Sequence, residues 1–223
     1  MYIFAENFRE MRKTTNKIKA IVFDAGGVLL DLNLERCRNA FKDILGYNRI
    51  DELLDPCLQK GIYGDMEEGR ITSEEFRRQV LAESKPGSTP EMVDACMEAL
   101  LDGIVPEKVT YLNLLKERYP LYLLSNNNEI AWACFHTIFR RDGIPIPETF
   151  KDCFLSYRMG LLKPNPEIFL KVIESLGLQP DEILYIDDSR ANAVSAARVG
   201  MNSLYYKRGS DLEQLVEGAL KKA

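Results

Sequence analysis

The sequence predicts a doubly wound α/β fold, a Rossmann-like parallel sheet with helices on both faces. Four short apolar runs are the first observation, because each is rich in β-branched or aromatic residues and stops abruptly at polar ones. They span residues 18–23, 121–124, 183–186 and 203–206. Such runs are typical of strands buried on both faces. Helical patterns separate the later runs, and this alternation favours a parallel sheet with right-handed crossovers.

The helices between the later strands have clear start and stop signals. Asn165-Pro166 supplies a capping residue and a first-turn proline, and Gly177 ends the helix that follows. A second helix is predicted from about Arg190 to Gly200. In parallel sheets, ligands bind beyond the carboxyl ends of the strands, where the polar residues after each apolar run fall.

Residues 33–103 interrupt this alternation and predict an inserted α-helical domain. Thr72–Glu75 has the pattern of a capping box, and Thr89-Pro90 begins another helix. Because the insert follows the first strand directly, we expect it to cover the sheet edge as a lid. The predicted domains are a core of residues 17–32 and 104–223, a helical cap of residues 33–103 and an N-terminal extension of residues 1–16, which we expect to be dispensable for the fold.

Composition excludes several classes of partner. The chain has 223 residues, a formal net charge of −5 and 46% hydrophobic residues, which suits one large domain or one domain with an insert. The acidic balance gives no electrostatic reason to expect nucleic acid or an anionic membrane as a partner. Apolar runs stay far below the ~20 residues of a membrane span. Five scattered cysteines without a C-x-x-C spacing suggest reduced thiols and a cytoplasmic protein.

His136 is the one histidine, and this excludes sites that need two or more. Zinc enzymes with H-E-x-x-H and histidine-based iron triads are therefore ruled out. The sequence also lacks the G-x-S-x-G elbow and the G-x-x-x-x-G-K-[ST] loop. Chemistry in this chain must therefore depend on carboxylates, lysine and hydroxyl groups.

Polar residues at the strand ends form the candidate site. They are Asp24, Ser125, Asn126, Asp187 and Asp188, joined by Lys163. Converging carboxylates repel one another, a divalent cation relieves this repulsion, and oxygen-only ligands favour Mg²⁺ over zinc. Hydroxyl, amide and lysine donors suit a tetrahedral anion. A carboxylate beside Mg²⁺ and a phosphate suggests phosphoryl transfer through an aspartyl-phosphate.

Four motifs in this order resemble those of the haloacid dehalogenase-like (HAD) hydrolase superfamily. They are Phe23–Leu29, Leu124–Asn127, Lys163-Pro164, and Ile186–Ser189 with Asn192. The resemblance covers Lys17 to Gly209, and the insert falls where this family carries its helical C1 cap. Residues 67–76 are similar to a cap signature of bacterial members. Within the family, the chain resembles the bacterial α-D-glucose-1-phosphate phosphatase branch.

The resemblance implies a role for each candidate residue. Asp24 would be the nucleophile and a Mg²⁺ ligand, with the Gly26 carbonyl as a second ligand. Asp188 would bind the metal directly, and Asp187 would either bind it directly or support its ligands without touching it. Phosphate would be bound by Ser125 and Asn126, while Lys163 would balance charge on the phosphate and on Asp24. In the cap, Tyr63, Glu67 and Arg70 are candidates to face the substrate, and the sequence singles out none of them.

Gly26 departs from the family pattern, because phosphatases and mutases of this family usually carry an aspartate there as general acid and base. A positioned acid is worth about 10²–10⁴-fold in rate. Either another group or water protonates the leaving oxygen, or the enzyme activity has been lost. Without this aspartate, substrates whose leaving oxygen is more acidic and needs less protonation are favoured, such as sugar 1-phosphates. The missing aspartate also argues against phosphomutase activity.

The sequence therefore predicts a Mg²⁺-dependent phosphomonoester hydrolase for a small phosphorylated metabolite, acting as a monomer or homodimer. One alternative is a non-catalytic HAD-fold binding or regulatory protein, supported by Gly26 alone. A second alternative is a 2-haloacid dehalogenase, whose aspartate attacks carbon without a metal. The adjacent acids Asp187 and Asp188 argue against this second alternative, because a metal-free site has little reason to hold them.

Overall fold

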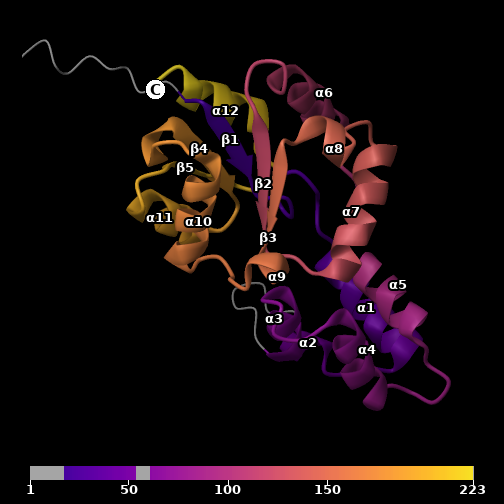
Figure 1. The fold of residues 1–223 in the computed structure, drawn as a ribbon. Helices are drawn as coiled ribbons and strands as arrows, with labels where there is room; N and C mark the ends of the chain where they lie inside the picture. Colours follow the sequence, from indigo (N-terminus) through magenta and orange to yellow (C-terminus); the bar gives the residue numbers. More distant parts are fainter. Residues whose placement is uncertain (1–17, 54–60, 223) are drawn as a thin grey trace, which may run out of the picture.

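A five-stranded parallel sheet forms the centre of the molecule (Figure 1). The computed structural model describes residues 18–53 and 61–222, so the predicted N-terminal extension lies outside the described residues. The strands run in the order β3-β2-β1-β4-β5 and every neighbouring pair is parallel. Their bounds are β1 Ala20–Phe23, β2 Leu121–Ser125, β3 Asp152–Leu155, β4 Ile183–Asp187 and β5 Asn202–Tyr205. The predicted α/β fold with a parallel sheet is confirmed.

Strand β3 was missing from the sequence prediction. It begins with an exposed residue, Asp152, and only Phe154 and Leu155 are buried in it. A four-residue edge strand with two buried side chains gives no continuous apolar run, so its sequence carries little strand signal. Pairing with β2 supplies the missing information, because Tyr122 to Ser125 align with Asp152 to Leu155.

Alternating side chains of the strands divide the core into two clusters, one on each face of the sheet. Ile21 and Phe23 belong to the larger cluster, whereas Val22 between them belongs to the smaller one. The larger cluster includes residues of α6 Pro106–Leu115, α7 Glu129–Arg141, α8 Ile146–Thr149 and α12 Leu212–Leu220. The smaller cluster is covered by α10 Pro166–Leu176 and α11 Arg190–Arg198. Two short elements, α9 Ser156–Met159 and the 3₁₀ helix Pro180–Glu182, complete the core.

Local capping chemistry explains where several helices begin and end. The Asn165 side chain accepts a hydrogen bond from the amide of Glu167 at the start of α10, and Gly177 ends that helix with a φ of 62°. At the start of α4 Ser73–Ala82, the Thr72 hydroxyl accepts from the amide of Glu75 at 3.1 Å. The carboxylate of Glu75 contacts Arg78 and Gln79 instead of returning to the capping residue. Only half of the predicted capping box therefore forms.

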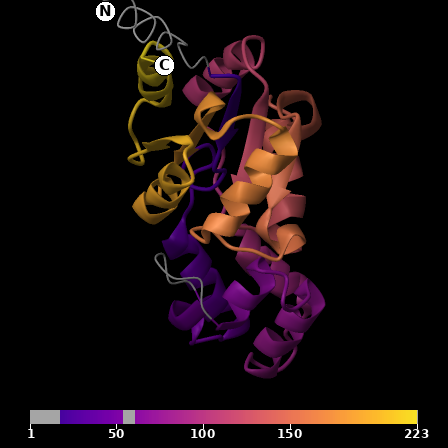
Figure 2. The ribbon, with the colours of Figure 1, turned by 60° about the vertical axis from the view of Figure 1, so that its left-hand side comes forward.

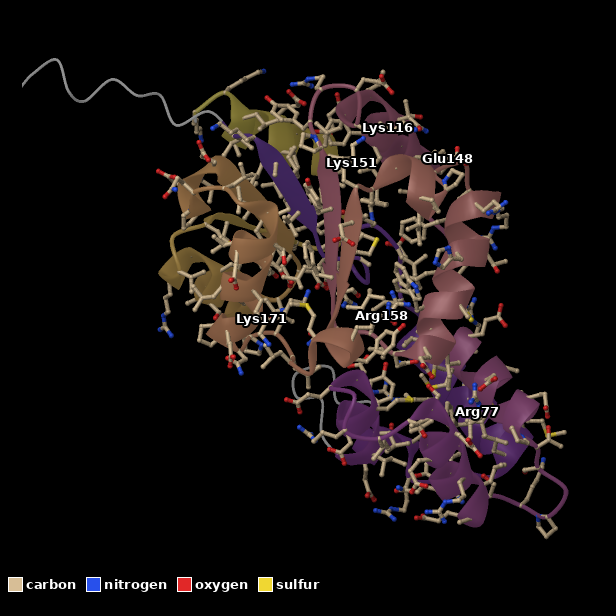
Figure 3. The ribbon with its side chains drawn as sticks, in the orientation of Figure 1. Arg77, Lys116, Glu148, Lys151, Arg158 and Lys171 are labelled. Atoms are coloured by element: carbon tan, nitrogen blue, oxygen red, sulfur yellow. The ribbon has the colours of Figure 1, made fainter. Side chains whose placement is uncertain are left out.

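Among the described residues, five helices lie between β1 and α6 in the sequence. They are α1 Leu34–Leu45, α2 Ile50–Leu53, α3 Gly61–Glu67, α4 Ser73–Ala82 and α5 Pro90–Glu98. They group together beyond the ends of the strands in both Figure 1 and the turned view of Figure 2. Figure 3 shows Arg77 in this group, while Lys116 and Lys151, which precede β2 and β3, lie at the opposite end of the molecule. The carboxyl ends of the strands therefore face this helical insert.

The two chain segments that connect the insert to the sheet lie side by side. The amide of Asn33 donates to the carbonyl of Leu100 at 2.8 Å, and the amide of Asp102 donates to the carbonyl of Asp31 at 2.9 Å. Arg36 reinforces this pairing: its guanidinium donates to the carbonyls of Ala99 and Leu101, both at 2.8 Å, and forms an ion pair with Asp102. This arginine thus ties the first helix of the insert to the returning segment.

The described residues also bear on membrane spans and on the state of the cysteines. Among the described helices, none has the length and apolar character required to cross a membrane. The four cysteines of the described residues are free thiols, and Cys57 lies outside the described residues.

We expect Arg36→Ala to lower the free energy of unfolding by about 1–2 kcal/mol, because two carbonyls lose a charged donor at a partly exposed position. Arg78→Ala is the matched control, since Arg78 is exposed and pairs only with Glu75 within one helix turn. Its expected cost is below about 0.5 kcal/mol. Urea denaturation measures both values, and equal costs would contradict a special role for Arg36.

Candidate active site

The carboxyl ends of β1, β2 and β4 bring most of the predicted site residues together. Asp24 follows β1, Ser125 ends β2 and Asp187 ends β4. A cavity of about 340 Å³ lies between this edge of the sheet and the helical insert. Its lining includes Asp24, Gly26, Ser125, Asn126, Lys163 and Asp188 from the sheet side, and Tyr63 and Glu67 from the insert. A cavity of this size is large enough for a small metabolite.

Lys163 connects the carboxylates of the site. Its ammonium Nζ lies 2.9 Å from Asp24 Oδ1, 2.8 Å from Asp187 Oδ2 and 2.9 Å from the carbonyl oxygen of Leu124. Its side chain is 1% exposed, so these charge-assisted contacts replace hydration. The two carboxylates hold the pKa of this lysine above its ordinary value despite its burial. Lys163 is therefore a fixed positive charge beside Asp24.

Asn126 holds the backbone of Lys163. Its carboxamide oxygen accepts from the amide of Lys163 at 2.9 Å, and its carboxamide nitrogen donates to the carbonyl of the same residue at 3.0 Å. The phosphate-binding role that the sequence predicts for Asn126 stays a prediction, and the structure adds that its side chain holds the backbone of Lys163. The neighbouring Asn127 is 2% exposed and lines the cavity, and its Nδ2 has no partner among the described residues. Asn127 is thus a donor that the sequence analysis did not identify.

Asp187 is fully buried, and several hydrogen-bond donors hold its carboxylate. Its carboxylate accepts from Lys163, from the hydroxyl of Tyr185, from the amide of Ser189 at 2.7 Å and from the carboxamide of Asn192 at 3.0 Å. These contacts fix the orientation of Asp187 and, through it, of the ammonium group of Lys163. The structure therefore gives Asp187 and Asn192 a clear supporting function within the site.

Asp188 lies at the mouth of the cavity beside the loop that follows β1. Its Oδ2 accepts a hydrogen bond from Nε of Arg208 at 2.5 Å. Gly27 has a φ of +83°, and a Cβ atom added there would lie 2.2 Å from the same carboxylate oxygen. The loop can therefore pass Asp188 only because residue 27 has no side chain.

Oxygen atoms of Asp24, Asp187 and Asp188 all lie within 4.8 Å of one another. Burial raises the pKa of Asp24 to about 7, and the charges of Asp187 and Asp188 add to this effect against the opposing charge of Lys163. A cluster of hard oxygen donors with uncompensated negative charge fits a divalent cation such as Mg²⁺. Because Asp187 is already saturated with donors, Asp24 and Asp188 are the carboxylates with more freedom to bind one.

Glu67 is the residue that the structure adds to the site from the insert. It ends α3, is 3% exposed and lines the cavity, and its Oε2 has no partner among the described residues. Burial and the charge of Asp24 raise the pKa of Glu67 to about 8, although the Tyr63 hydroxyl and Lys163 oppose the shift. Of the three insert candidates, Arg70 is separate, because its exposed guanidinium pairs with Asp65 and Glu68.

Comparison with known proteins gives this arrangement a family. The sequence model of the haloacid dehalogenase-like hydrolases matches residues 18–200, which is most of the chain. The chain belongs to the haloacid dehalogenase-like hydrolase family. The D-ribitol-5-phosphate phosphatase of Bacteroides thetaiotaomicron is 33% identical over 199 residues, which are 88% of this chain and 96% of that protein. The resemblance drawn from the four motifs is thus confirmed.

Solved structures of other family members share the whole architecture. A HAD family enzyme from Bacteroides thetaiotaomicron, solved with magnesium and inorganic phosphate, has a TM-score of 0.80 at 36% identity. This match covers 87% of the present chain and 96% of that enzyme. A HAD-like hydrolase from Porphyromonas gingivalis has a TM-score of 0.83 at 35% identity, covering 92% and 99% of the two chains.

We expect Gly27→Ala to destabilise the protein more than Gly87→Ala does. Both glycines have a positive φ, of 83° and 87°, so backbone strain of about 1–3 kcal/mol applies to each variant. Only at Gly27 does the new methyl group also collide with Asp188 and Arg208, because the space around Gly87 is open. Urea denaturation measures the difference. Equal destabilisation would show that the loop after β1 moves away easily.

We expect the stability of Glu67→Gln, measured relative to the wild type, to increase as pH rises. Since folding raises the pKa of Glu67 from its ordinary 4.5 to about 8, the folded state binds the proton more tightly over that range. Wild-type stability therefore falls as pH rises through this window, by an amount on the order of a few kcal/mol, and glutamine cannot titrate.

Urea denaturation of the wild type and Glu67→Gln between pH 5 and 9 measures this effect. Glu74→Gln, at an exposed position of α4, is the control and is expected to follow the wild type. A stability difference between Glu67→Gln and the wild type that stays constant with pH would contradict the predicted shift.

Proposed function

We propose that this chain is a Mg²⁺-dependent phosphomonoester hydrolase acting on a small sugar or polyol phosphate. The observation that carries the proposal is the buried cluster in which Lys163 contacts both Asp24 and Asp187 beside the cavity. A nucleophilic carboxylate beside a fixed cation and hard oxygen donors suits phosphoryl transfer. The named phosphatase relative and the phosphate-bound structure of a family member support the same chemistry.

In the proposed reaction, Asp24 attacks the phosphorus atom in line with the bond to the leaving oxygen. The phosphorus–oxygen bond to the alcohol breaks, and an aspartyl-phosphate forms on Asp24. Water then attacks phosphorus, inorganic phosphate leaves, and the carboxylate of Asp24 is regenerated. Lys163 neutralises negative charge on Asp24 and the phosphoryl oxygens throughout.

The remaining site residues would bind and neutralise the phosphoryl group. Ser125 and Asn126 at the end of β2 would bind it, and the carboxamide nitrogen of Asn127, which has no partner among the described residues, is a further donor in the cavity lining. Asp24, Asp188 and the carbonyl of Gly26 would hold Mg²⁺, with Asp187 supporting from behind. Bound there, the metal would supply a positive charge for the phosphoryl oxygens and relieve the repulsion among the carboxylates.

We propose further that residues 33–103 act as a cap domain over a core of residues 17–32 and 104–223. The cavity supports this assignment, because its lining combines strand-end residues with Tyr63, Glu67, Leu100 and Leu101 of the insert. Cap residues would then contact the part of the substrate that leaves with the alcohol oxygen. Water exclusion by the insert would strengthen each electrostatic contact inside.

Two classes of ester are supported by different observations. Gly26 offers no side chain for protonation, which favours sugar 1-phosphates with their more acidic leaving oxygen. The relative named D-ribitol-5-phosphate phosphatase supports a primary ester of a sugar alcohol. A substrate panel of D-glucose 1-phosphate, D-glucose 6-phosphate and D-ribitol 5-phosphate separates the two classes by kcat/KM.

We expect p-nitrophenyl phosphate to be hydrolysed in the presence of Mg²⁺, and we expect EDTA to abolish this activity. Asp24→Asn is expected to lower kcat on the order of 10³-fold or more, because a carboxamide is a poor nucleophile. Asp211→Asn is the control for the change of residue type, because Asp211 is the exposed N-cap residue of α12 and does not line the cavity. Phosphate release measures all four arms.

Two results would oppose the proposal. An inactive, folded wild type that still binds Mg²⁺ would favour the non-catalytic binding protein. Chloride release from a 2-haloacid that persists in EDTA would favour a dehalogenase.

A further inference from the structure

We propose that Glu67 of the insert is the group that protonates the leaving oxygen and then activates water, the task for which Gly26 has no side chain. This inference rests on the phosphatase activity proposed above and names a further catalytic residue for it. An alkoxide is a poor leaving group, so the breaking phosphorus–oxygen bond needs a proton at its oxygen.

The acid must come from the described residues that line the cavity and can carry a proton. Asp24 is the nucleophile, and Lys163 is committed to two carboxylates and a carbonyl. Asp188 is paired with Arg208 at the metal-binding cluster. Tyr63 is buried, and its pKa is raised well above 10 by burial and by the charge of Glu67. Glu67 is the carboxyl group of this lining that has neither a cationic partner nor a place in the cluster.

The position of Glu67 suits this task. It lies on the insert side of the cavity, and the charges of Asp24 and Lys163 act on its carboxyl group from the sheet side. A leaving group that departs in line from Asp24 moves away from the sheet and towards the insert. The Oε2 atom of Glu67 has no hydrogen-bond partner among the described residues, so it is available to the leaving oxygen.

Glu67 is also anchored to the core and does not depend on the insert alone. The hydroxyl of Ser156, the first residue of α9, donates to the carbonyl of Glu67 at 2.5 Å and accepts from the amide of Asn127 at 2.9 Å. Gly69 passes so close to α9 that an added Cβ would lie 2.4 Å from the carbonyl oxygen of Tyr157. Figure 3 shows α9, with Arg158, at this boundary between sheet and insert. The contacts fix Glu67 relative to the loop that follows β2.

The environment of Glu67 keeps the acid protonated near neutral pH. The groups that face it are Tyr63 on its own helix, and Asp24 and Lys163 across the cavity. Burial and Asp24 raise its pKa to about 8, so the carboxyl group carries the proton that the first step needs.

The proposed proton transfers balance over the two steps. As Asp24 attacks phosphorus, the carboxyl proton of Glu67 moves to the departing alcohol oxygen, and an alcohol and a Glu67 carboxylate result. The carboxylate then takes a proton from the water that attacks the aspartyl-phosphate. Phosphate leaves, the carboxylate of Asp24 is restored, and Glu67 is protonated again for the next turnover.

The test compares two esters in Glu67→Gln, which keeps the shape of the side chain and removes the transferable proton. We expect kcat for D-ribitol 5-phosphate, or for the fastest primary alkyl phosphate of the panel, to fall about 10²–10⁴-fold. With p-nitrophenyl phosphate the fall in the rate of aspartyl-phosphate formation should be less than about 10-fold, because nitrophenolate leaves without a proton. Rapid-quench measurement of that first step separates it from the hydrolysis that follows.

Glu68→Gln is the matched control, since Glu68 is the next residue, does not line the cavity and pairs with Arg70. It is expected to keep wild-type rates with both esters. The alkaline fall of kcat for the alkyl ester should be present in the wild type and Glu68→Gln and absent from the residual activity of Glu67→Gln.

Three results would overturn the assignment. They are equal losses of the first step for both esters in Glu67→Gln, unchanged rates for both, and a wild type that hydrolyses aryl but no alkyl phosphates. Retained aryl-ester activity in Glu67→Gln shows that the variant is folded. Failure of the proposed function has a different signature, which is an inactive wild type or an active Asp24→Asn with p-nitrophenyl phosphate.

Discussion

The rest of the site depends on the contacts that the ammonium group of Lys163 makes with Asp24 and Asp187. Asp24, Asp187 and Asp188 converge within a few ångströms, and burial makes their repulsion expensive. Lys163 and Arg208 supply two positive charges against these three negative ones, so one negative charge is left over when all are ionised. Burial, together with this imbalance, raises the pKa of Asp24. The same imbalance gives a divalent cation and a phosphate ester complementary places in the site.

Several residues that carry no reaction themselves keep this charge arrangement in place. Asn126 holds the backbone of Lys163 through two hydrogen bonds, and Asn192 and Ser189 hold the carboxylate of Asp187. The parallel sheet supplies the frame, because strands that run in one direction bring their carboxyl ends to one edge. A buried lysine held on both its backbone and its ammonium group has little freedom to move. Such preorganisation lets fixed charges act on a transferring phosphoryl group without reorganisation cost.

The insert contributes apolar residues of the cavity lining and a second buried carboxyl group, that of Glu67. Of the two buried acids Asp24 and Glu67, Lys163 contacts Asp24 directly, whereas Glu67 faces the cavity without a cationic partner. In the proposed mechanism, these different surroundings prepare one carboxylate for attack on phosphorus and the other for proton transfer. The pairing of residues 31–33 with residues 100–103, tightened by Arg36, and the contact of Ser156 with Glu67 keep the two halves in register.

Local sequence patterns were sufficient to predict the parallel α/β core, the helical character of the insert and one shared site. The site residues predicted together in this way include Asp24, Lys163, Asp187 and Asp188. Continuous apolar runs and capping residues are local signals, and strand ends of a parallel sheet must meet at one edge. The remaining features depend on contacts between segments that are distant in the sequence. Strand β3 depends on pairing with β2, and Asn126 turns to Lys163 because the loop before Pro164 lies beside it. Glu67 was indistinguishable from Tyr63 and Arg70 in the sequence, because the direction of a side chain from the insert is set by helix packing against α9 and not by local pattern.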